Sequence, residues 1–393
     1  MFEVAQRMHK LSTGIFSEME AHKRRVEETG SKVINLGIGS PDRPPGEHIK
    51  EALIKGIQND NNYRYPVFEG RLDLREAVAR WYLKRFGVKL DPEQEVLILM
   101  GSQDGLGHLA WAYINPGEIA LVPDPGYPIY SASILLAGGE IYPMPLKEER
   151  GFLPDFRAIP ETAARKAKMM MLNYPSNPVA AVANAGFFRE AVEFGKKYNV
   201  LICHDAAYSE LAFDGFKPMS FLEVEGAKEV GIEFHSCSKT FNMAGCRIGF
   251  VVGRADVVQN LNKIKSNIDY GVFTAVQEAA LTALDGPPEF VRENAAAYQR
   301  RRDVLVDGLA KVGWKIPKPK GSMFLWAKIP EGFSSSMAFS IELLEKAGVL
   351  VIPGNAFGEQ GEGYVRIALT QSEEALQEVV ERVNNIVSCN FNI

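Results

Sequence analysis

The 393-residue sequence has little cysteine and none of the cysteine or histidine spacings that are typical of metal sites. Its four cysteines, Cys203, Cys237, Cys246 and Cys389, include no C-x-x-C pair, and its six histidines include no H-x-x-x-H pair. We therefore expect no bound metal, and we expect the cysteines to be packing residues of a protein in a reducing compartment.

Long hydrophobic runs and an excess of basic residues are also missing. The longest apolar runs, such as residues 96–100 and 169–172, are far too short to span a bilayer, and residues 1–10 contain no apolar signal core. The formal net charge is −5, with no basic cluster. These features argue against a membrane or a nucleic acid as partner, and we expect a cytoplasmic protein.

The sequence HSCSKTFNMAGCRIGF, residues 235–250, is the most informative segment that is present. Lys239 lies among Ser236, Ser238 and Thr240, between two strand-like apolar runs, and Arg247 follows eight positions later. Burial lowers the pKa of a lysine, and serine and arginine can donate to a phosphate. Pyridoxal phosphate needs both features, because its aldehyde forms a Schiff base with lysine. A surface Lys-Thr turn between strands is the alternative interpretation.

Residues 95–253 alternate between strand-like and helical patterns, and the strand-like runs are continuously apolar. This pattern predicts an α/β fold with a mostly parallel central sheet wrapped by helices. We expect residues 46–287 to form a large domain and residues 1–45 plus 288–393 to form a smaller α+β domain. Gly37 and Gly39 do not indicate a dinucleotide loop, because Pro41 follows where a helix should begin.

Two polar residues follow the apolar strand that ends near residue 203. Asp205 would be largely buried, and a buried carboxylate needs a partner such as a protonated pyridine nitrogen. A helix N-cap is the alternative role for this aspartate. Tyr208 could donate to the phenolate oxygen of the same ring, or it could be a packed core tyrosine.

Other polar residues follow other strands. Asn177 lies in a loop fixed by two prolines and could reach the phenolate, although an Asn-Pro turn is the alternative. Ser102 and Gln103 begin a predicted helix and could bind a phosphate or serve as a helix cap. Tyr127 could stack on the ring. Arg366, inside a strand pattern, could bind a substrate carboxylate or form a structural ion pair.

These motifs, in this order, resemble the class I/II, fold-type I pyridoxal-phosphate aminotransferases over nearly the whole chain. The motifs are Gly39-Ser40-Pro41-Asp42, Tyr65 to Gly70 with Leu74-Arg75, Gly101-Ser102-Gln103, Pro125-Gly126-Tyr127-Pro128, Asn177-Pro178, Asp205 with Tyr208, Ser236-Cys237-Ser238-Lys239, Arg247-Ile248-Gly249 and Arg366. The resemblance implies a pyridoxal-phosphate enzyme that forms a homodimer with shared active sites.

The resemblance also implies residue roles. Lys239, Asp205 and Tyr208 would be catalytic. The cofactor would be bound by Ser102, Gln103, Tyr127, Asn177, Asp205, Tyr208, Ser236, Ser238, Lys239 and Arg247, and by Tyr65 of the neighbouring subunit. Gly39, Arg366 and Asn177 would bind the substrate.

The implied reaction moves an amino group from an L-amino acid to a keto acid, for which we expect 2-oxoglutarate. Strings such as HDAAYSELAFDG are most similar to bacterial LL-diaminopimelate aminotransferases of lysine biosynthesis, in which Glu69 is a candidate for binding the distal ammonium of the substrate. Ala180, Cys246 and Tyr270 depart from the usual pattern. Aspartate, alanine or aromatic aminotransferases and a C–S β-lyase on the same fold remain alternatives. A non-enzymatic regulator would need a DNA-binding segment, and we recognise none before residue 33.

Overall fold

A seven-stranded sheet forms the centre of the computed structural model, which describes residues 2–11 and 14–390, with side chains up to residue 385. The strand order is β2-β8-β7-β6-β5-β3-β4. Strands β7, β6, β5, β3 and β4 are parallel, whereas β8 runs antiparallel to both of its neighbours. The strands are β2 (Val96–Leu99), β3 (Ile119–Asp124), β4 (Glu140–Pro145), β5 (Ala167–Asn173), β6 (Leu201–Asp205), β7 (Gly231–Ser236) and β8 (Gly249–Gly253).

Helices cover both faces of this sheet, which explains why its central strands are apolar on both sides. One face packs against α4 (Ser102–Tyr113), α5 (Pro128–Leu136) and α10 (Ala255–Lys265). The other face packs against α3 (Leu72–Phe86), α7 (Ala185–Tyr198), α8 (Ala227–Val230) and α11 (Thr274–Asp285). Three further helices lie outside these two layers: α2 (Glu47–Ile57) against α11, the short α6 (Glu161–Lys166), and α9 (Cys237–Thr240), which directly follows β7.

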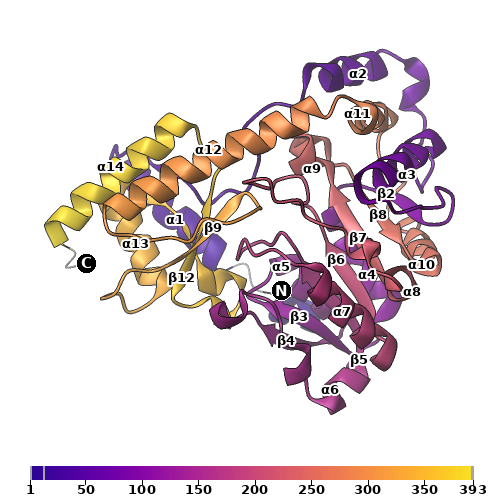
Figure 1. The fold of residues 1–393 in the computed structure, drawn as a ribbon, viewed down its shortest axis with the longest axis horizontal. Coiled ribbons are helices and arrows are strands. Elements are labelled where there is room, and N and C mark those ends of the chain that lie inside the picture. Colours follow the sequence, from indigo (N-terminus) through magenta and orange to yellow (C-terminus); the bar gives the residue numbers. More distant parts are fainter. Residues whose placement is uncertain (1, 12–13, 391–393) are drawn as a thin grey trace.

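Elements from early and late in the chain lie together in a second group, which contains the elements of residues 14–35 and those after residue 323 (Figure 1). Here β11 (Ile352–Pro353), β12 (Tyr364–Ala368) and β9 (Phe324–Lys328) form an antiparallel sheet, and β1 (Ile34–Asn35) pairs with β10 (Val349–Leu350). Helices α1 (Gly14–Glu28), α13 (Ser336–Ala347) and α14 (Glu373–Asn390) surround them. The long helix α12 (Glu289–Lys311) runs from the end of α11 to the side of α14 (Figure 1).

The predicted α/β architecture is confirmed, and helix α4 begins at Ser102, as predicted. Helices α5 and α9 are among the elements that were not predicted. Helix α5 begins at Pro128, which suits the first helical position because proline has no N–H to donate. Helix α9 is one turn long and carries Lys239. The division into domains stays a prediction, since the core of the second group also contains residues 207–213 of the sheet unit.

The cysteines of the described chain carry no bond to each other. Cys203 and Cys237 are buried, as expected of packing residues, and Cys246 is half-buried. The side chain of Cys389 lies outside the described residues. No described helix is long and apolar enough to cross a membrane.

Candidate active site

One cavity of about 970 Å³ opens where β5, β6 and β7 end, between the large sheet and the second group of elements. This position follows from the fold, because the carboxyl ends of parallel strands meet at one edge of the sheet. The cavity is lined by all but one of the predicted site residues: Gly39, Ser102, Gln103, Tyr127, Asn177, Asp205, Tyr208, Ser236, Ser238, Lys239, Arg247 and Arg366. Tyr65, with 84% of its surface exposed, is the exception among these residues, and Glu69, the candidate for a distal ammonium, does not line the cavity either.

Lys239 projects into the cavity from the single turn of α9. Its Nζ donates a hydrogen bond to the carbonyl oxygen of Gly39, at 2.6 Å. Burial, together with the positive charges of Arg366 and Arg247, lowers the pKa of Lys239 from 10.5 to about 8. Near neutral pH this amine therefore releases its proton far more readily than a surface lysine does. Lys239 does lie in a short turn between two strands, as the alternative interpretation expected, but its side chain lines the cavity.

Asp205 ends β6 and lies almost completely buried at the cavity wall. Its Oδ2 accepts a hydrogen bond from the Tyr130 hydroxyl at 2.8 Å, and its Oδ1 accepts one from the Ala207 backbone N–H at 3.2 Å. Burial raises the pKa of Asp205, although the Tyr130 hydrogen bond acts in the opposite direction. A cation beside this carboxylate would stabilise its charged form.

Tyr208 lies on the same wall, three residues beyond the strand. Burial, reinforced by the charge of Asp205, raises the pKa of the Tyr208 hydroxyl above its ordinary value. The hydroxyl therefore stays protonated and can donate a hydrogen bond. The ring packs edge-on against Phe324, with centroids 5.7 Å apart, so the residue contributes to the core as well as to the cavity.

Hydrogen-bond donors converge at the N-terminus of α4. Gly101, at the cap position, has a φ of 81° and no side chain, and a Cβ there would lie 2.6 Å from Arg247 Nη2. The glycine therefore brings Arg247 close to the helix N-terminus, where backbone N–H groups attract anions. Ser236 and Ser238 line the same part of the cavity, from the end of β7 and the turn of α9.

Tyr127 stands beside this cluster at the N-cap position of α5. Its hydroxyl donates to Gln103 Oε1 at 2.9 Å, which fixes the ring at the cavity wall. Gln103 therefore has a side-chain partner in the cavity wall, whereas the sequence suggested a phosphate contact or a helix cap for it.

Arg366, on β12, is buried and has no carboxylate partner. Its Nη1 donates to Asn177 Oδ1 at 2.9 Å and its Nη2 donates to the Gly37 carbonyl at 2.7 Å. Burial lowers its pKa to about 10, so the guanidinium is still charged at neutral pH. Its Nε has no hydrogen-bond partner. The structural ion pair considered from the sequence is therefore absent among the described residues, and the cation is available to an anion that enters the cavity.

Gly39 is needed for close packing. A Cβ on this residue would lie 2.5 Å from the Phe324 ring, which itself packs under the Arg366 guanidinium at 4.3 Å. The Gly39 backbone can therefore approach Lys239 and Arg366 as no other residue could.

Two further residues of the site were missed from the sequence. Tyr130 binds Asp205 directly, and Asn173 joins two loops by donating to the Asp205 carbonyl and accepting from the Asn177 N–H, each at 2.7 Å. Asn173 ends a strand, which was a usable signal. Tyr130 lies in the helix that was not predicted.

These residues fit pyridoxal phosphate. A buried carboxylate, a lysine of lowered pKa and an uncapped helix N-terminus with an arginine beside it match the three charged or reactive parts of that molecule. Arg366 lines the same cavity, and its guanidinium is suited to the carboxylate of an amino acid. By contrast, the described residues contain no group of three or more acidic, histidine or cysteine side chains that could hold a metal ion.

Comparison with known proteins agrees with this chemistry. Residues 31–383 match the family described as Aminotransferase class I and II. The chain belongs to this family. It is a pyridoxal-phosphate-dependent aminotransferase, which moves an amino group from an amino acid to a keto acid. The fold is that of the fold-type I enzymes.

Individual relatives of this aminotransferase cover nearly the whole chain. It is 50% identical over 383 residues to an LL-diaminopimelate aminotransferase of Moorella thermoacetica and 48% identical to one of Halothermothrix orenii, with 98% of each chain covered. A substrate-bound structure of BacF from Bacillus subtilis has a TM-score of 0.95 and 42% identity, also with 98% of each chain covered. A Thermus thermophilus aspartate aminotransferase mutant has a TM-score of 0.91 at 27% identity, covering 98% of this chain and 100% of its own.

Three residues that the sequence linked to binding lie away from the cavity walls. Tyr65 and Tyr270 are exposed and pack on each other, with ring centroids 4.9 Å apart. Glu69 is half-buried in the same segment and does not line the cavity. Within the single chain, the structure therefore does not bring these residues to Lys239.

Proposed function

We propose that this aminotransferase takes its amino group from LL-diaminopimelate and passes it to 2-oxoglutarate. Sequence identity of 44–50% to enzymes named LL-diaminopimelate aminotransferase, over 97–98% of the chain, supports this choice of amino donor. The observation that carries the chemistry is the buried Lys239 amine in one cavity with Asp205 and Arg366. Relatives with other substrates, such as the aspartate aminotransferase, are less similar.

We assign the cofactor contacts as follows. Lys239 would hold pyridoxal phosphate covalently, Asp205 would pair with its ring nitrogen, and Tyr127 would stack on the ring. Tyr208 and Asn177 would donate to the phenolate oxygen. The phosphate would be bound by Ser102, Gln103, Ser236, Ser238 and Arg247. When bound, the cofactor supplies an aldehyde that takes up the amino group and a ring that accepts the electron pair of Cα.

The protein then binds the amino acid and moves one proton. Arg366 would bind the α-carboxylate, with its unpartnered Nε and the Gly39 backbone beside it. The neutral Lys239 Nζ would take the proton from Cα of the bound amino acid and later give it up again, so that this amine serves as both general base and general acid. Its pKa of about 8 suits this step, since a general base works best when its pKa lies near the working pH.

Lys239→Ala tests the chemistry. We expect the variant to lose transamination, because both the anchor and the base are gone, and to keep its fold, because one side chain at a cavity wall is removed. Circular dichroism and single-turnover assays with an amino donor measure the two properties. Full activity would reject the assignment of Lys239.

A substrate panel tests the donor. We expect kcat/KM with 2-oxoglutarate to be highest for LL-diaminopimelate, with aspartate, alanine and aromatic amino acids well below it. A higher value for one of these would reject the proposed donor. Release of pyruvate and ammonia from a sulfur-containing amino acid, without any acceptor keto acid, would instead indicate a β-lyase.

We also propose a cytoplasmic homodimer in which Tyr65 binds the cofactor phosphate of the neighbouring subunit. The exposed aromatic residues Tyr63, Tyr65 and Tyr270 support such an interface. Glu69 would then bind the distal ammonium of a diamino substrate across this interface. Glu69→Gln should raise KM for a diamino acid far more than for a monoamino acid. Equal increases in KM for the two substrates would reject this role of Glu69.

A further inference from the structure

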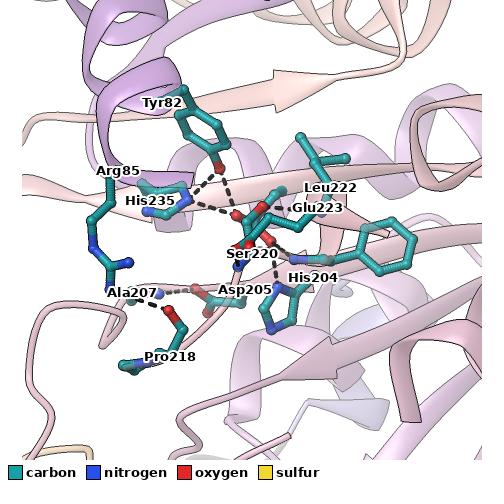
Figure 2. A network of polar contacts seen from close by, with 12 residues as sticks. Tyr82, Arg85, His204, Asp205, Ala207, Pro218, Ser220, Leu222, Glu223 and His235 are labelled. Atoms are coloured by element: carbon teal, nitrogen blue, oxygen red, sulfur yellow. Dashed lines mark hydrogen bonds and ion pairs between the residues drawn. The ribbon is translucent and has the colours of Figure 1, made fainter. Parts of the chain in front are cut away.

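A buried carboxylate lies behind the active site and belongs to none of the roles above. Glu233, on β7, is fully buried. Four groups surround its carboxylate: the Tyr82 hydroxyl, the His204 ring, the His235 ring and the Phe221 backbone N–H. We call these five residues the Glu233 network. Figure 2 shows Tyr82, His204 and His235 in it, with Asp205 next to His204 on its strand.

Strand geometry places the Glu233 network on the reverse face of the site strands. Successive side chains point to opposite faces of a sheet. On β7, Glu233 and His235 therefore point to one face, and Ser236 points to the other. On β6, His204 shares the face of Glu233, its register partner, while Asp205 points toward the cavity.

At Glu233 Oε2, backbone N–H donors determine which nitrogen of His204 carries a proton. The Tyr174 backbone N–H donates to His204 Nε2 at 3.2 Å, so that nitrogen carries no proton. His204 Nδ1 must then donate to Glu233 Oε2, at 2.7 Å. Phe221 N–H donates to the same oxygen at 2.7 Å, and a backbone donor cannot reverse its role.

The other carboxylate oxygen has adjustable partners. The Tyr82 hydroxyl donates to Glu233 Oε1 at 2.5 Å, and His235 Nε2 lies 2.9 Å from the same atom. Although burial alone would raise it, hydrogen bonds from His204 and His235 hold the pKa of the Glu233 carboxyl well below its ordinary value. The network is thus an ionised carboxylate whose acceptor positions are all filled.

Two residues of the Glu233 network, His204 and His235, and the Tyr174 backbone that binds His204 are each adjacent in sequence to a residue of the active site. Tyr174 follows Asn173, which binds the Asp205 carbonyl and the Asn177 N–H. His204 precedes Asp205, and His235 precedes Ser236. One carboxylate therefore ties together the ends of β5, β6 and β7, which present the groups proposed for the phenolate, the ring nitrogen and the phosphate.

We propose that Glu233 is a positioning residue that aligns these three strand ends for the cofactor. The inference rests on the proposed roles of Asn177, Asp205 and Ser236. A displacement of about 1 Å in such groups costs about 100-fold in rate, so an anchor that joins all three has a direct effect on the site. Glu233 itself touches neither cofactor nor substrate.

Glu233→Gln tests the proposal with little change in shape. The amide nitrogen cannot face Phe221 N–H and His204 Nδ1–H, so it must turn toward Tyr82 and His235 and rearrange the end of β7 near Ser236. We expect the Kd for pyridoxal phosphate to rise about tenfold or more. We also expect the pH midpoint of the absorbance of the bound cofactor to shift, because Asp205 moves relative to the ring nitrogen.

Glu223→Gln is the matched control. Glu223 lies in the same region, but it caps a short helix by accepting from Ser220 N–H at 2.7 Å, and glutamine can do the same. We expect its Kd to stay within about twofold of the native value. A Glu233→Gln protein that only unfolds at lower temperature, with native Kd and native pH midpoint, would overturn the proposal. Failure of the native protein to bind pyridoxal phosphate would instead reject the proposed function.

His204→Asn decides the question if Glu233→Gln does not fold. The asparagine amide can place a donor where His204 Nδ1 lies, but the side chain is too short to place its oxygen at the position of Nε2, so Tyr174 N–H loses its acceptor and the loop that carries Asn177 is released. We expect KM for the amino donor to rise several-fold, about fivefold or more, with a smaller change in kcat. Unchanged KM and cofactor affinity would overturn the proposal.

Discussion

At the scale of single residues, the reactivity of the site depends on which charges are buried together. Lys239, Arg247 and Arg366 are three cations around one cavity, and Asp205 is the carboxylate among them. Burial lowers the pKa of Lys239 and raises that of Asp205, so the surroundings of the cavity disfavour both charges. Opposite charges on a ligand would stabilise these buried groups. A phosphate and a carboxylate would pair with the cations, and a protonated ring nitrogen would pair with Asp205.

The lowered pKa of Lys239 predicts how stability depends on pH. Between pH 8 and 10.5, the unfolded chain binds more protons at this lysine than the folded chain does, so its contribution to the free energy of unfolding rises with pH. Lys239→Met has no such proton. Without cofactor, the variant should be more stable than the native protein near pH 7, and the difference should shrink from pH 8 to 10.5. Urea titrations across this range measure it, and parallel curves would contradict the burial of the charge.

Asp205→Ala should lower transamination by orders of magnitude, because no carboxylate would then keep the ring nitrogen protonated. A loss below about tenfold, or about 1.4 kcal/mol, would contradict that role. Tyr130→Phe is the comparison, since it removes only the 2.8 Å hydrogen bond and leaves the carboxylate. Its kcat should fall less than that of Asp205→Ala, and both should be measured at saturating cofactor.

At the scale of secondary-structure elements, a buried lysine holds helix α4 in place. Lys265, at the end of α10, is fully buried, and its Nζ donates to Asp104 at 2.9 Å and to Asp269 at 2.6 Å. Asp104 belongs to the first turn of α4, beside the proposed phosphate contacts, and it also accepts from His108 at 2.8 Å. Asp269 accepts from Gly271 N–H, in the loop that packs against residues 67–68.

Lys265→Met should destabilise the protein by about 3–5 kcal/mol, because it leaves two aspartates without their buried counter-ion. Lys263→Met, on the same helix but exposed, should change stability by less than about 0.5 kcal/mol. Chemical unfolding of the cofactor-free proteins measures both changes. If the two variants were equally stable, the buried ion pairs would carry no net stability.

At the scale of the whole molecule, the cavity lies between the large sheet and the group of elements formed by both chain ends. Gly39 and Arg366 approach it from that second group, and Lys239 and Asp205 approach it from the sheet. Helix α12 runs from the end of α11 to the side of α14, and its Arg301 binds Asp42 through two hydrogen bonds of 2.7 and 2.6 Å. The loop of Gly39 is thereby held by a helix that begins next to the sheet unit.

Mixing two variants tests the proposed sharing of sites between subunits. Tyr65→Ala lacks the tyrosine that we propose binds the cofactor phosphate in the neighbouring subunit, and Lys239→Ala lacks the catalytic amine of its own site. A hybrid dimer would have one site with a native Lys239 and a native Tyr65 from its neighbour. We expect the mixture, after exchange of subunits, to be more active than the sum of the separate variants. Strict additivity, in a mixture proven to contain hybrids, would contradict a shared site.

The sequence by itself determined the sheet, most helices and the identity of the reactive groups. Continuous apolar runs predicted buried parallel strands, and polar residues directly after them, such as Asp205 and Asn177, pointed to the edge where ligands bind. Lys239 among serines indicated the cofactor. These signals are local, because they depend on residues a few positions apart in the chain.

Only the tertiary structure decided which groups share protons and charge. Tyr130 reaches Asp205 across 75 positions, and the Arg366 guanidinium meets Gly37 across 329. The carboxylate of Glu233 accepts hydrogen bonds from Tyr82, His204 and Phe221, which lie in three different elements, and no sequence periodicity reveals this convergence. Hydrogen bonds act over about 3 Å in space, and that distance is set by the packing of the whole chain.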